Sequence, residues 1–422
     1  MGATRNILVV DLNAWDRAHF MPTPARWAKK YNVILHEPDD GCDVTRDPLG
    51  FIDRTIDRFK RKPIHGVVSS SDFPGCIVAS AIARELRLPA PSPQSVLRCS
   101  HKYVSRLAQA EVVPEATPRF ALLSTRSEAA AGLRFPLFVK PIKSWYSVLA
   151  RKVDSAAELK SFLSQPTVKR FERQFLRPFK RLARRYADFE ANGGSFIAEE
   201  VMHGSQATLE GFVSDGEVET IGIVDSVMYP GTMSFERFEY PSSLPKRVQE
   251  RMRDLAARVM KHIGYDNGIF NIEMFYDRAQ NQVRIIEINP RMAGQFADLM
   301  EKVDGTNTYD LLLALASGER PRLDRRKGAL KVAASFALRS FRDEMVARVP
   351  DEARIARVKR LFPRTGVYVF VREGQRLSEF EHQDDLDSYC YAVMNMGAED
   401  RRSLVKAYRQ ARQHLEFSFA AD

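Results

Sequence analysis

Two strand-like runs within residues 268–291 constrain this chain more than any other part of its sequence. They read GIFNIEMFYD and VRIIEINPR, and the polar connection RAQNQ between them predicts an antiparallel hairpin. A turn centred on this connection places Asn271 opposite Asn289 and Glu273 opposite Glu287. Because successive side chains of a strand point to opposite faces, these four polar residues share one face of the hairpin.

The opposite face of the predicted hairpin is apolar. We expect it to pack on the core, because a register slip of one residue would bury the acids instead. This face carries Ile272, Met274, Ile286 and Ile288. Two carboxylates directly across a strand pair repel each other, so the polar face is typical of a site that holds a cation.

The donors on the polar face suit magnesium. Mg²⁺ takes one or two carboxylates and completes its shell with water and phosphate oxygens, and Mn²⁺ accepts similar oxygen ligands. Glu273, Glu287 and Asn289 are therefore the candidate metal ligands. Arg291 follows, and its planar guanidinium suits a phosphate or a carboxylate. The alternative is an exposed polar face on an edge hairpin.

Strands and helices alternate in residues 1–94. Residues 5–10, 31–37 and 64–69 read as buried strands, and an alanine-rich helix follows at 75–86. This alternation predicts an open parallel α/β sheet. No G-x-G-x-x-G follows the first strand, so a dinucleotide site there is unsupported.

Polar residues stand at the ends of two of these strands, at Asp11 and at 69–72. Open α/β sheets bind ligands at this edge, whereas the alternative is that these are ordinary loop residues. The Pro/Ser-rich segment 89–98 then predicts a linker. Beyond residue 318 the chain mixes short strands with a helix near 399–415, which predicts a small α+β region.

Residues 169–185 are the most basic stretch, with eight Lys and Arg residues and one acid, Glu172. Phe and Leu residues fall at helical spacing among these charges, which predicts an amphipathic helix. Such a helix suits an anionic lipid surface, a nucleic acid or an acidic substrate. The alternative, which we favour, is a solvated helix that packs on the protein through its Phe/Leu stripe.

Length and composition set the class of protein. The chain has 422 residues, of which 44% are apolar, and a net charge of +10. No apolar run approaches the roughly 18 residues of a membrane span, and the run at 7–10 is too short for a signal peptide. We therefore expect a cytoplasmic protein. The cysteines form no C-x-x-C, so neither a zinc knuckle nor a disulfide framework is indicated.

Four segments together resemble a known family. EINPRMAGQ (287–295), preceded by NIEM, resembles the magnesium hairpin of the ATP-grasp superfamily, in particular of its carboxylate–amine ligases, such as D-alanine–D-alanine ligase, carbamoyl-phosphate synthetase and L-amino-acid ligase. Residues 100–120 resemble the helix and strand that begin with a phosphate-binding lysine. Residues 135–141 resemble the strand of the ATP lysine, and residues 196–204 the strand that contacts adenine.

The resemblance runs in order from about residue 95 to 318 and implies a two-subdomain ATP-grasp core there. A lid-like subdomain would span about 136–204 and include a basic insertion at 165–190. Residues 1–94 would form the preceding α/β domain, and residues 319–422 a C-terminal extension.

The resemblance also implies roles for individual residues. Lys102 and Lys140 would hold the ATP phosphates, and Glu199 would contact the adenine amino group. The remaining assignments are the backbone of Glu200, Val201 and Met202 for the adenine edge, Gln206 for the ribose, Glu273, Glu287 and Asn289 for magnesium, and Arg291, with Lys140, for catalysis on the transferred phosphate or substrate carboxylate.

Two positions depart from the family pattern. The family usually has an acid at the position of Gln206, and a glycine-rich loop in place of residues 142–147. Glycine lets a backbone approach phosphate closely, so its absence leaves Lys143, Ser144 and Ser147 as side-chain substitutes. These departures keep a non-catalytic or regulatory nucleotide-binding protein open as an alternative.

The first functional hypothesis is an ATP-dependent ligase. A substrate carboxylate would become an acyl phosphate, and an amine would then displace phosphate to form an amide or peptide bond. The implied partners are ATP, Mg²⁺, and small carboxylate and amine substrates, which the basic insertion would suit if they were acidic or carrier-bound. Nucleic-acid or anionic-surface binding is the weaker alternative, and a homodimer is expected from similar ligases.

Overall fold

The N-terminal strands form the predicted parallel sheet, with strand order β2-β1-β3. The computed structural model describes residues 4–22, 25–38, 43–127, 130–145, 148–189, 194–380, 384–385 and 388–420. The elements of this region are β1 (Arg5–Val10), α1 (Ala14–Phe20), α2 (Ala25–Ala28), β2 (Tyr31–His36), α3 (Pro48–Phe59), β3 (Gly66–Val68) and α4 (Gly75–Glu85). Alternation along β1 sends Leu8 and Val10 into the core with α3 and α4, and Ile7 and Val9 into the core with α12 (Thr308–Ala316).

A second, four-stranded sheet has the order β4-β7-β5-β6. We call it the lid-like sheet. Its strands are β4 (Phe120–Leu123), β5 (Leu137–Pro141), β6 (Arg151–Val153) and β7 (Phe196–Glu200), and α7 (Ala156–Ser164) packs on it. β4 lies before residue 136, so the lid-like sheet includes a strand that precedes the predicted lid-like subdomain.

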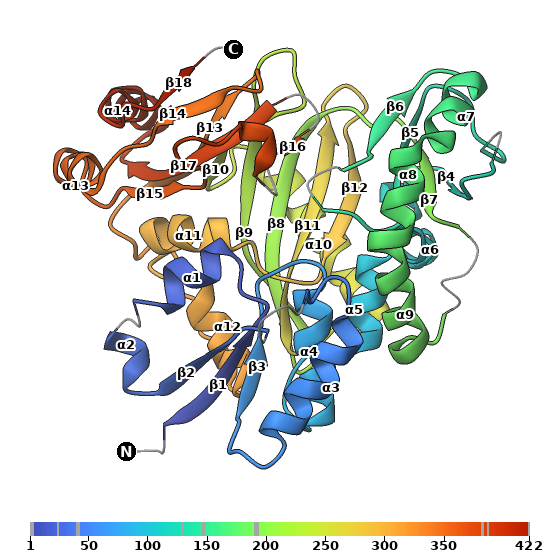
Figure 1. Cartoon of the computed structure of the whole chain (residues 1–422), viewed down its shortest axis with the longest axis horizontal. Coiled ribbons are helices and arrows are strands. Elements are labelled where there is room, and N and C mark those ends of the chain that lie inside the picture. Colours follow the sequence, from blue (N-terminus) through green and yellow to red (C-terminus); the bar gives the residue numbers. More distant parts are fainter. Residues whose placement is uncertain are drawn as a thin grey trace.

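The largest sheet is antiparallel, with the order β12-β11-β8-β9-β10-β13-β17-β15, and β16 (Asp384–Asp385) pairs with β17. We call it the central sheet (Figure 1). Its other strands are β8 (Ser205–Ser214), β9 (Glu217–Met228), β10 (Phe235–Tyr240), β11 (Gly268–Asp277), β12 (Gln282–Asn289), β13 (Val332–Ser340), β15 (Gly366–Val369) and β17 (Ser388–Ala398). Strands of the C-terminal region therefore extend the central sheet through the β10–β13 pair.

The fold class is confirmed, since an open parallel sheet is combined with larger antiparallel sheets. Further elements are α10 (Lys246–Ile263), α11 (Ala297–Asp304), β14 (Met345–Arg348), α13 (Glu352–Leu361), α14 (Arg401–Gln413), β18 (Ser418–Ala420) and short 3₁₀ turns. The domain boundaries after residues 94 and 318 stay predictions. Within the described residues, no helix has the length and apolar character that crossing a membrane requires.

The predicted linker at 89–98 is wrong in its second half. Residues Pro93–Ser100 form α5, followed directly by α6 (Lys102–Val112). The Ser92 side chain accepts a hydrogen bond from the backbone N–H of Ser95, and Pro93 occupies the first helical turn. Ser at the N-cap and Pro at the first helical position are helix-start signals, and the Pro/Ser-rich composition concealed them.

The predicted hairpin register is confirmed over the acidic pairs. Asn271 pairs with Asn289 and Glu273 with Glu287, but the register then shifts, so that Met274 pairs with Ile285. Ile285 is buried and Ile286 is only partly so, which corrects the predicted core face. A β-bulge inserts one extra residue into a strand, and no period-two pattern reveals it in advance.

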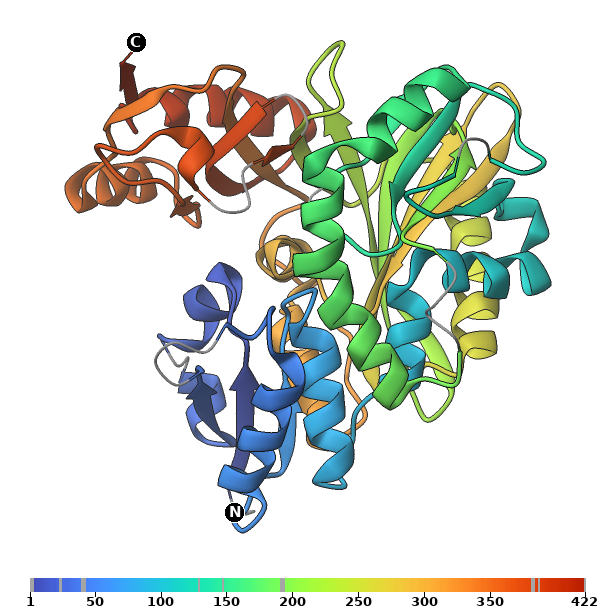
Figure 2. The ribbon, with the colours of Figure 1, turned by 45° about the vertical axis from the view of Figure 1, so that its right-hand side comes forward.

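The basic stretch forms one long bent helix, consisting of α8 (Pro166–Phe171), a π-helical turn η2 (Glu172–Leu176) and α9 (Arg177–Tyr186). Its apolar stripe is buried, and the Phe179 ring lies 5.6 Å from that of Phe73. Figure 2 shows this helix (green) passing from the lid-like sheet to the N-terminal helices. The structure therefore agrees with the favoured interpretation, a solvated helix that packs on the protein through its Phe/Leu stripe.

Packing of this helix is testable with a buried and an exposed substitution. Phe179 has no exposed surface, so Phe179→Ala should lower the free energy of unfolding by about 3–5 kcal/mol through lost burial and a residual cavity. Arg181 is exposed, and Arg181→Ala should change it by less than about 0.5 kcal/mol. Denaturant unfolding followed by circular dichroism measures both, and equal small effects would contradict the packing.

Candidate active site

The acidic end of the β11–β12 hairpin faces the start of α6. Lys102, the first residue of α6, places its Nζ 2.9 Å from Glu287 Oε2. Burial would raise the pKa of Glu287, but Lys102 and Lys140 outweigh it and hold that pKa well below its usual range. Burial likewise opposes the charge of Lys102, and Glu287 overcomes this and raises the lysine pKa. Both groups are therefore charged, as the sequence-predicted roles require.

Glu273 stands across the strand pair in a different environment. Burial and the neighbouring Glu287 both raise its pKa. Its carboxylate accepts hydrogen bonds from Gln206 Nε2 at 2.9 Å and from Asn289 Nδ2 at 3.3 Å. The structure thus brings the three predicted metal ligands together with Gln206. Gln206 contacts Glu273, and its predicted ribose contact is untested.

These donors fit a divalent cation of the magnesium type. Two carboxylates and an amide oxygen are hard ligands, and burial and Glu287 raise the pKa of Glu273 although Arg291, Lys102 and Lys140 act to lower it, so a cation bound between the acids would stabilise the charged pair. No cluster of three or more His, Cys, Asp or Glu side chains suited to a metal occurs among the described residues. Such an ion would therefore depend on oxygen atoms from water or phosphate, as Mg²⁺ usually does.

Lys140 is the penultimate residue of strand β5, and its side chain joins a buried ion network. Its Nζ lies 2.8 Å from Glu199 Oε2, and Arg106 Nε lies 2.6 Å from Glu199 Oε1. The bulge carbonyl of Ile286 accepts hydrogen bonds from Arg106 Nη2 at 2.8 Å and from Lys140 Nζ at 3.3 Å. Burial lowers the pKa of Lys140, so a phosphate beside it would stabilise its charge.

Glu199 has no exposed surface, and Arg106 and Lys140 outweigh burial to lower its pKa. This placement favours a role in orienting Lys140, which the sequence did not suggest. Its predicted adenine contact stays a prediction. Glu200 points elsewhere, 3.3 Å from Arg284 Nη1, and Val201 and Met202 after it are partly exposed.

Arg291 and Lys143 meet on an acid from the N-terminal sheet. Asp72, in the loop between β3 and α4, has Oδ2 3.3 Å from Arg291 Nη2 and forms an ion pair with Lys143. The glycine-free loop therefore places the Lys143 ammonium on Asp72, and its predicted contact to phosphate stays a prediction. Ser144 is buried, whereas Ser147 lies outside the described residues.

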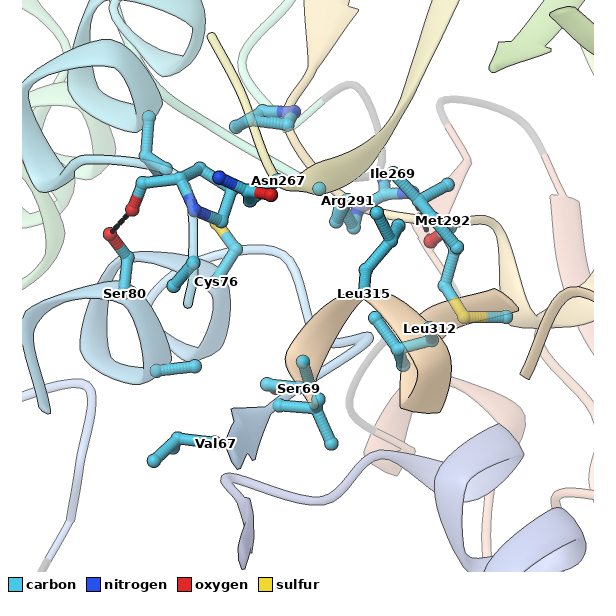
Figure 3. Close-up of a pocket in the computed structure, with 18 of the residues that line it drawn as sticks. Val67, Ser69, Cys76, Ser80, Asn267, Ile269, Arg291, Met292, Leu312 and Leu315 are labelled. Atoms are coloured by element: carbon cyan, nitrogen blue, oxygen red, sulfur yellow. Dashed lines mark hydrogen bonds between the residues drawn. The ribbon is translucent and has the colours of Figure 1, made fainter. Parts of the chain in front are cut away.

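A cavity of about 50 Å³ is lined by Arg291 and by residues from β3, α4, β11 and α12. Figure 3 shows Val67, Cys76, Leu312 and Leu315 around it, with Ser69, which follows β3, between Val67 and Leu312 in this view. Its volume suits water but not a nucleotide. The acidic end of the hairpin, where Lys102 and Lys140 lie near Glu287, is the candidate for phosphate binding because of its cations and not because of its volume.

Comparison with known families agrees with this geometry. Residues 133–298 match the family model of the ATP-grasp domain. The chain contains an ATP-grasp domain. The matched segment includes Lys140, Glu199 and the acidic hairpin, and therefore three of the four segments on which the resemblance in sequence depends.

Relatives match nearly the whole chain. An uncharacterized protein, y4rH, from Sinorhizobium fredii is 25% identical over 390 residues, covering 90% of this chain and 74% of that protein. The crystal structure of L-amino acid ligase from Bacillus licheniformis is similar with a TM-score of 0.76 and 15% identity, covering 100% of both chains. The biotin carboxylase domain dimer of Hydrogenobacter thermophilus 2-oxoglutarate carboxylase, in complex with MgADP, ADP and bicarbonate, has a TM-score of 0.65 and 14% identity, covering 100% of this chain and 92% of that one. At these identities the structures support the fold of the ATP-grasp domain.

Sequence reasoning missed Arg106 as part of this ATP-grasp site. Arg106 stands four residues after Lys102 in α6, and residues four apart share a helix face. This spacing was the available signal. Asp72 was noted only as a strand-end residue, since nothing local links it to Arg291.

Glu210 on β8 is a second carboxylate near the Arg291 loop of the ATP-grasp domain. It is fully buried, its Oε2 accepts a hydrogen bond from Ala293 N at 3.3 Å, and its Oε1 has no hydrogen-bond partner among the described residues. Burial raises its pKa to about 8. Ionising Glu210 therefore opposes folding.

The pH dependence of stability tests this assignment. As pH rises, Glu210 ionises in the unfolded state at about pH 4.5 but in the folded state only at about pH 8. The contribution of Glu210 to the free energy of unfolding therefore falls from about pH 4.5 and is fully lost above about pH 8. Glutamine does not ionise, so Glu210→Gln removes this loss. In urea unfolding, the free energy of unfolding of the variant relative to that of the wild type should rise by a few kcal/mol between about pH 5 and 8 and stay constant above pH 8. The exposed Glu217→Gln is the control, and a pH-independent difference for Glu210→Gln would contradict the buried ionisation.

Proposed function

We propose that this protein is an ATP-dependent carboxylate–amine ligase. The observation that carries the proposal is the opposed Glu273–Glu287 pair. Lys102 forms an ion pair with Glu287, and Lys140 forms one with the neighbouring Glu199. The comparisons support an ATP-grasp ligase in coarse terms, and the MgADP complex of a similar fold supports the nucleotide and the metal.

We assign each group of site residues a separate role in phosphoryl transfer. Lys102 and Lys140 would neutralise the phosphates as point charges, and Arg291 would hold the substrate carboxylate or the phosphate moved to it. Glu273, Glu287 and Asn289 would hold Mg²⁺, which when bound supplies charge neutralisation for the phosphate oxygens. Glu199 and Arg106 would keep Lys140 in place by burying it in an ion network.

The proposed reaction has two steps. A carboxylate oxygen forms a bond to the γ-phosphorus, the bond to the β,γ-bridging oxygen breaks, and ADP leaves. An amine then attacks the acyl carbon, phosphate leaves with the bonding electrons, and the amine loses a proton. Positioning and charge neutralisation dominate such transfers, which agrees with a site built mainly from cations and carboxylates.

A non-catalytic nucleotide-binding protein is the second candidate. It is favoured by the glycine-free loop and by the pairing of Lys102, Lys140 and Lys143 with carboxylates of the chain itself. Phosphates would have to compete with these carboxylates. Homodimer formation, acidic or carrier-bound substrates and a cytoplasmic location stay predictions.

An assay of ADP release tests the ligase. Purified protein with ATP, Mg²⁺ and panels of acids and amines should release ADP for at least one pair. Glu287→Gln and Lys140→Ala should reduce this release at least 100-fold, because each removes a charged contact to the phosphates or their metal. Their fold, followed by circular dichroism, should be kept.

Exposed residues provide matched controls. Glu217→Gln and Lys152→Ala make the same chemical changes on the surface and should keep full activity. Full activity in Glu287→Gln and Lys140→Ala would refute the site. ATP binding by calorimetry without turnover on any panel would instead favour the non-catalytic protein.

A further inference from the structure

The long helix α8–η2–α9 carries charge that the proposed function does not use. Residues 166–186 contain eight Lys and Arg residues and one acid, a net charge of +7 against +10 for the whole chain. The helix lies on the outside of the molecule (Figure 2). Every fourth residue along it is exposed and positively charged, and we call these residues the cation row: Lys169, Arg173, Arg177 and Arg181.

The π-helical turn helps to keep the cation row on one side of the helix. In a regular α-helix, residues four apart drift around the axis by about 40° per step. The turn η2 lies within the row, and its hydrogen bonds join residues five apart, which offsets part of this drift. Phe175, Phe179 and Leu182, which alternate with these cations, are buried. The row therefore occupies the face that is turned away from the protein.

The one acid of this helix does not neutralise the cation row. Glu172 accepts a hydrogen bond from Ser195 Oγ beside the lid-like sheet, and Lys180 Nζ donates to the same hydroxyl at 3.1 Å. Within the described part of the chain, the side chains of the row form no ion pair or hydrogen bond. Like charges four residues apart destabilise a helix, so this pattern favours a face that meets an anionic partner.

Arg185 shows which kind of anion the spacing suits. It continues the four-residue spacing of the row, and its Nη2 and Nη1 donate to Asp53 Oδ1 at 2.8 Å and Oδ2 at 3.0 Å. Asp53 belongs to α3, so the series already pairs with a carboxylate of a neighbouring helix in bidentate geometry. Acids four residues apart on a further helix would repeat about every 6 Å, which is the spacing of the row.

A membrane surface and a nucleic acid fit the cation row less well. Helices that lie on membranes bury an apolar face in the lipid, whereas the apolar face of this helix is buried in the protein. Single-stranded nucleic acids stack on exposed aromatic rings, and no large apolar side chain is exposed among the described residues 164–188. The phosphates of one duplex strand repeat about every 3.4 Å along the axis, which differs from the spacing of the row.

We propose that the cation row docks an acidic helix of a partner protein that carries Glu or Asp side chains at four-residue intervals. This interaction goes beyond the proposed function and does not depend on turnover. The inner face of the same helix contacts the glycine-free loop, where the ring of Phe175 lies 4.4 Å from that of Trp145. The partner is therefore held across one helix from the loop that carries Lys143.

Two labelled peptides of equal composition test the proposal. Both are alanine- and glutamine-based and about 20 residues long, so that they form helices, which circular dichroism checks. The matched peptide carries Glu at every fourth position, and the spread peptide carries the same number of Glu residues at every fifth position. Binding to the full chain is measured by fluorescence anisotropy at about 50 and 200 mM salt, with a DNA duplex, an RNA duplex and phosphatidylserine vesicles as competitors.

Three double variants are compared with the wild type. Arg173→Glu with Arg177→Glu reverses the charge of the row, and Arg173→Gln with Arg177→Gln removes it. Lys246→Glu with Arg247→Glu makes the same reversal on exposed residues of α10 and is the control. Because every substituted side chain is exposed, urea unfolding should show that the variants stay folded.

The wild type should bind the matched peptide about tenfold or more tightly than the spread peptide, because only the matched peptide aligns several charged hydrogen bonds. The Gln variant should weaken this binding about tenfold and the Glu variant about 100-fold, since reversed charges repel the peptide. The control variant should bind like the wild type. Higher salt should weaken binding to the row and leave the preference for the matched peptide in place.

The opposite results are equally clear. Equal binding of the two peptides, binding that is unchanged in both row variants, or no binding of either peptide overturns the proposal. If a nucleic-acid duplex or the vesicles bind more tightly than the matched peptide and lose this binding in the row variants, the row serves that partner instead and the proposal also fails. None of these outcomes bears on ADP release, so the ligase assignment is decided separately.

Discussion

The repulsion between Glu273 and Glu287 is the constraint on which the site depends. Antiparallel pairing sets the two carboxylates opposite each other, and burial strengthens their repulsion. The two acids have different partners: Lys102 forms an ion pair with Glu287, whereas the hydrogen bonds that the described residues donate to Glu273 come from the amides of Gln206 and Asn289. One acid stays ionised and the other has a raised pKa, so the pair is completed best by a further cation.

The same principle extends outward from the hairpin. Lys140 and Arg106 share Glu199, and Lys143 and Arg291 share Asp72, so cations and carboxylates alternate along the site. These pairs connect the lid-like, central and N-terminal sheets through a few buried charges. Because removing one partner of a buried pair is costly, substituting any one of these residues should affect its partners as well.

Local pattern and tertiary packing contributed differently to the fold. The strand period predicted the register of the acidic pairs, because a slip would have buried charge. The bulge at Ile286 escaped prediction, since one inserted residue leaves no periodic trace, yet it exposes the carbonyl that Arg106 and Lys140 bind. The basic helix kept its Phe/Leu face inside, as amphipathic spacing predicted.

The sequence by itself determined the hairpin, its opposed carboxylates, the parallel N-terminal sheet and the order of the ATP-grasp segments. Each of these features follows from a local pattern of residues a few positions apart. Only the tertiary structure decided that Arg106 supports Glu199 and that Asp72 meets Arg291, residues separated by 219 positions. Such contacts arise from the packing of whole sheets against one another. No local period records which charges that packing brings together.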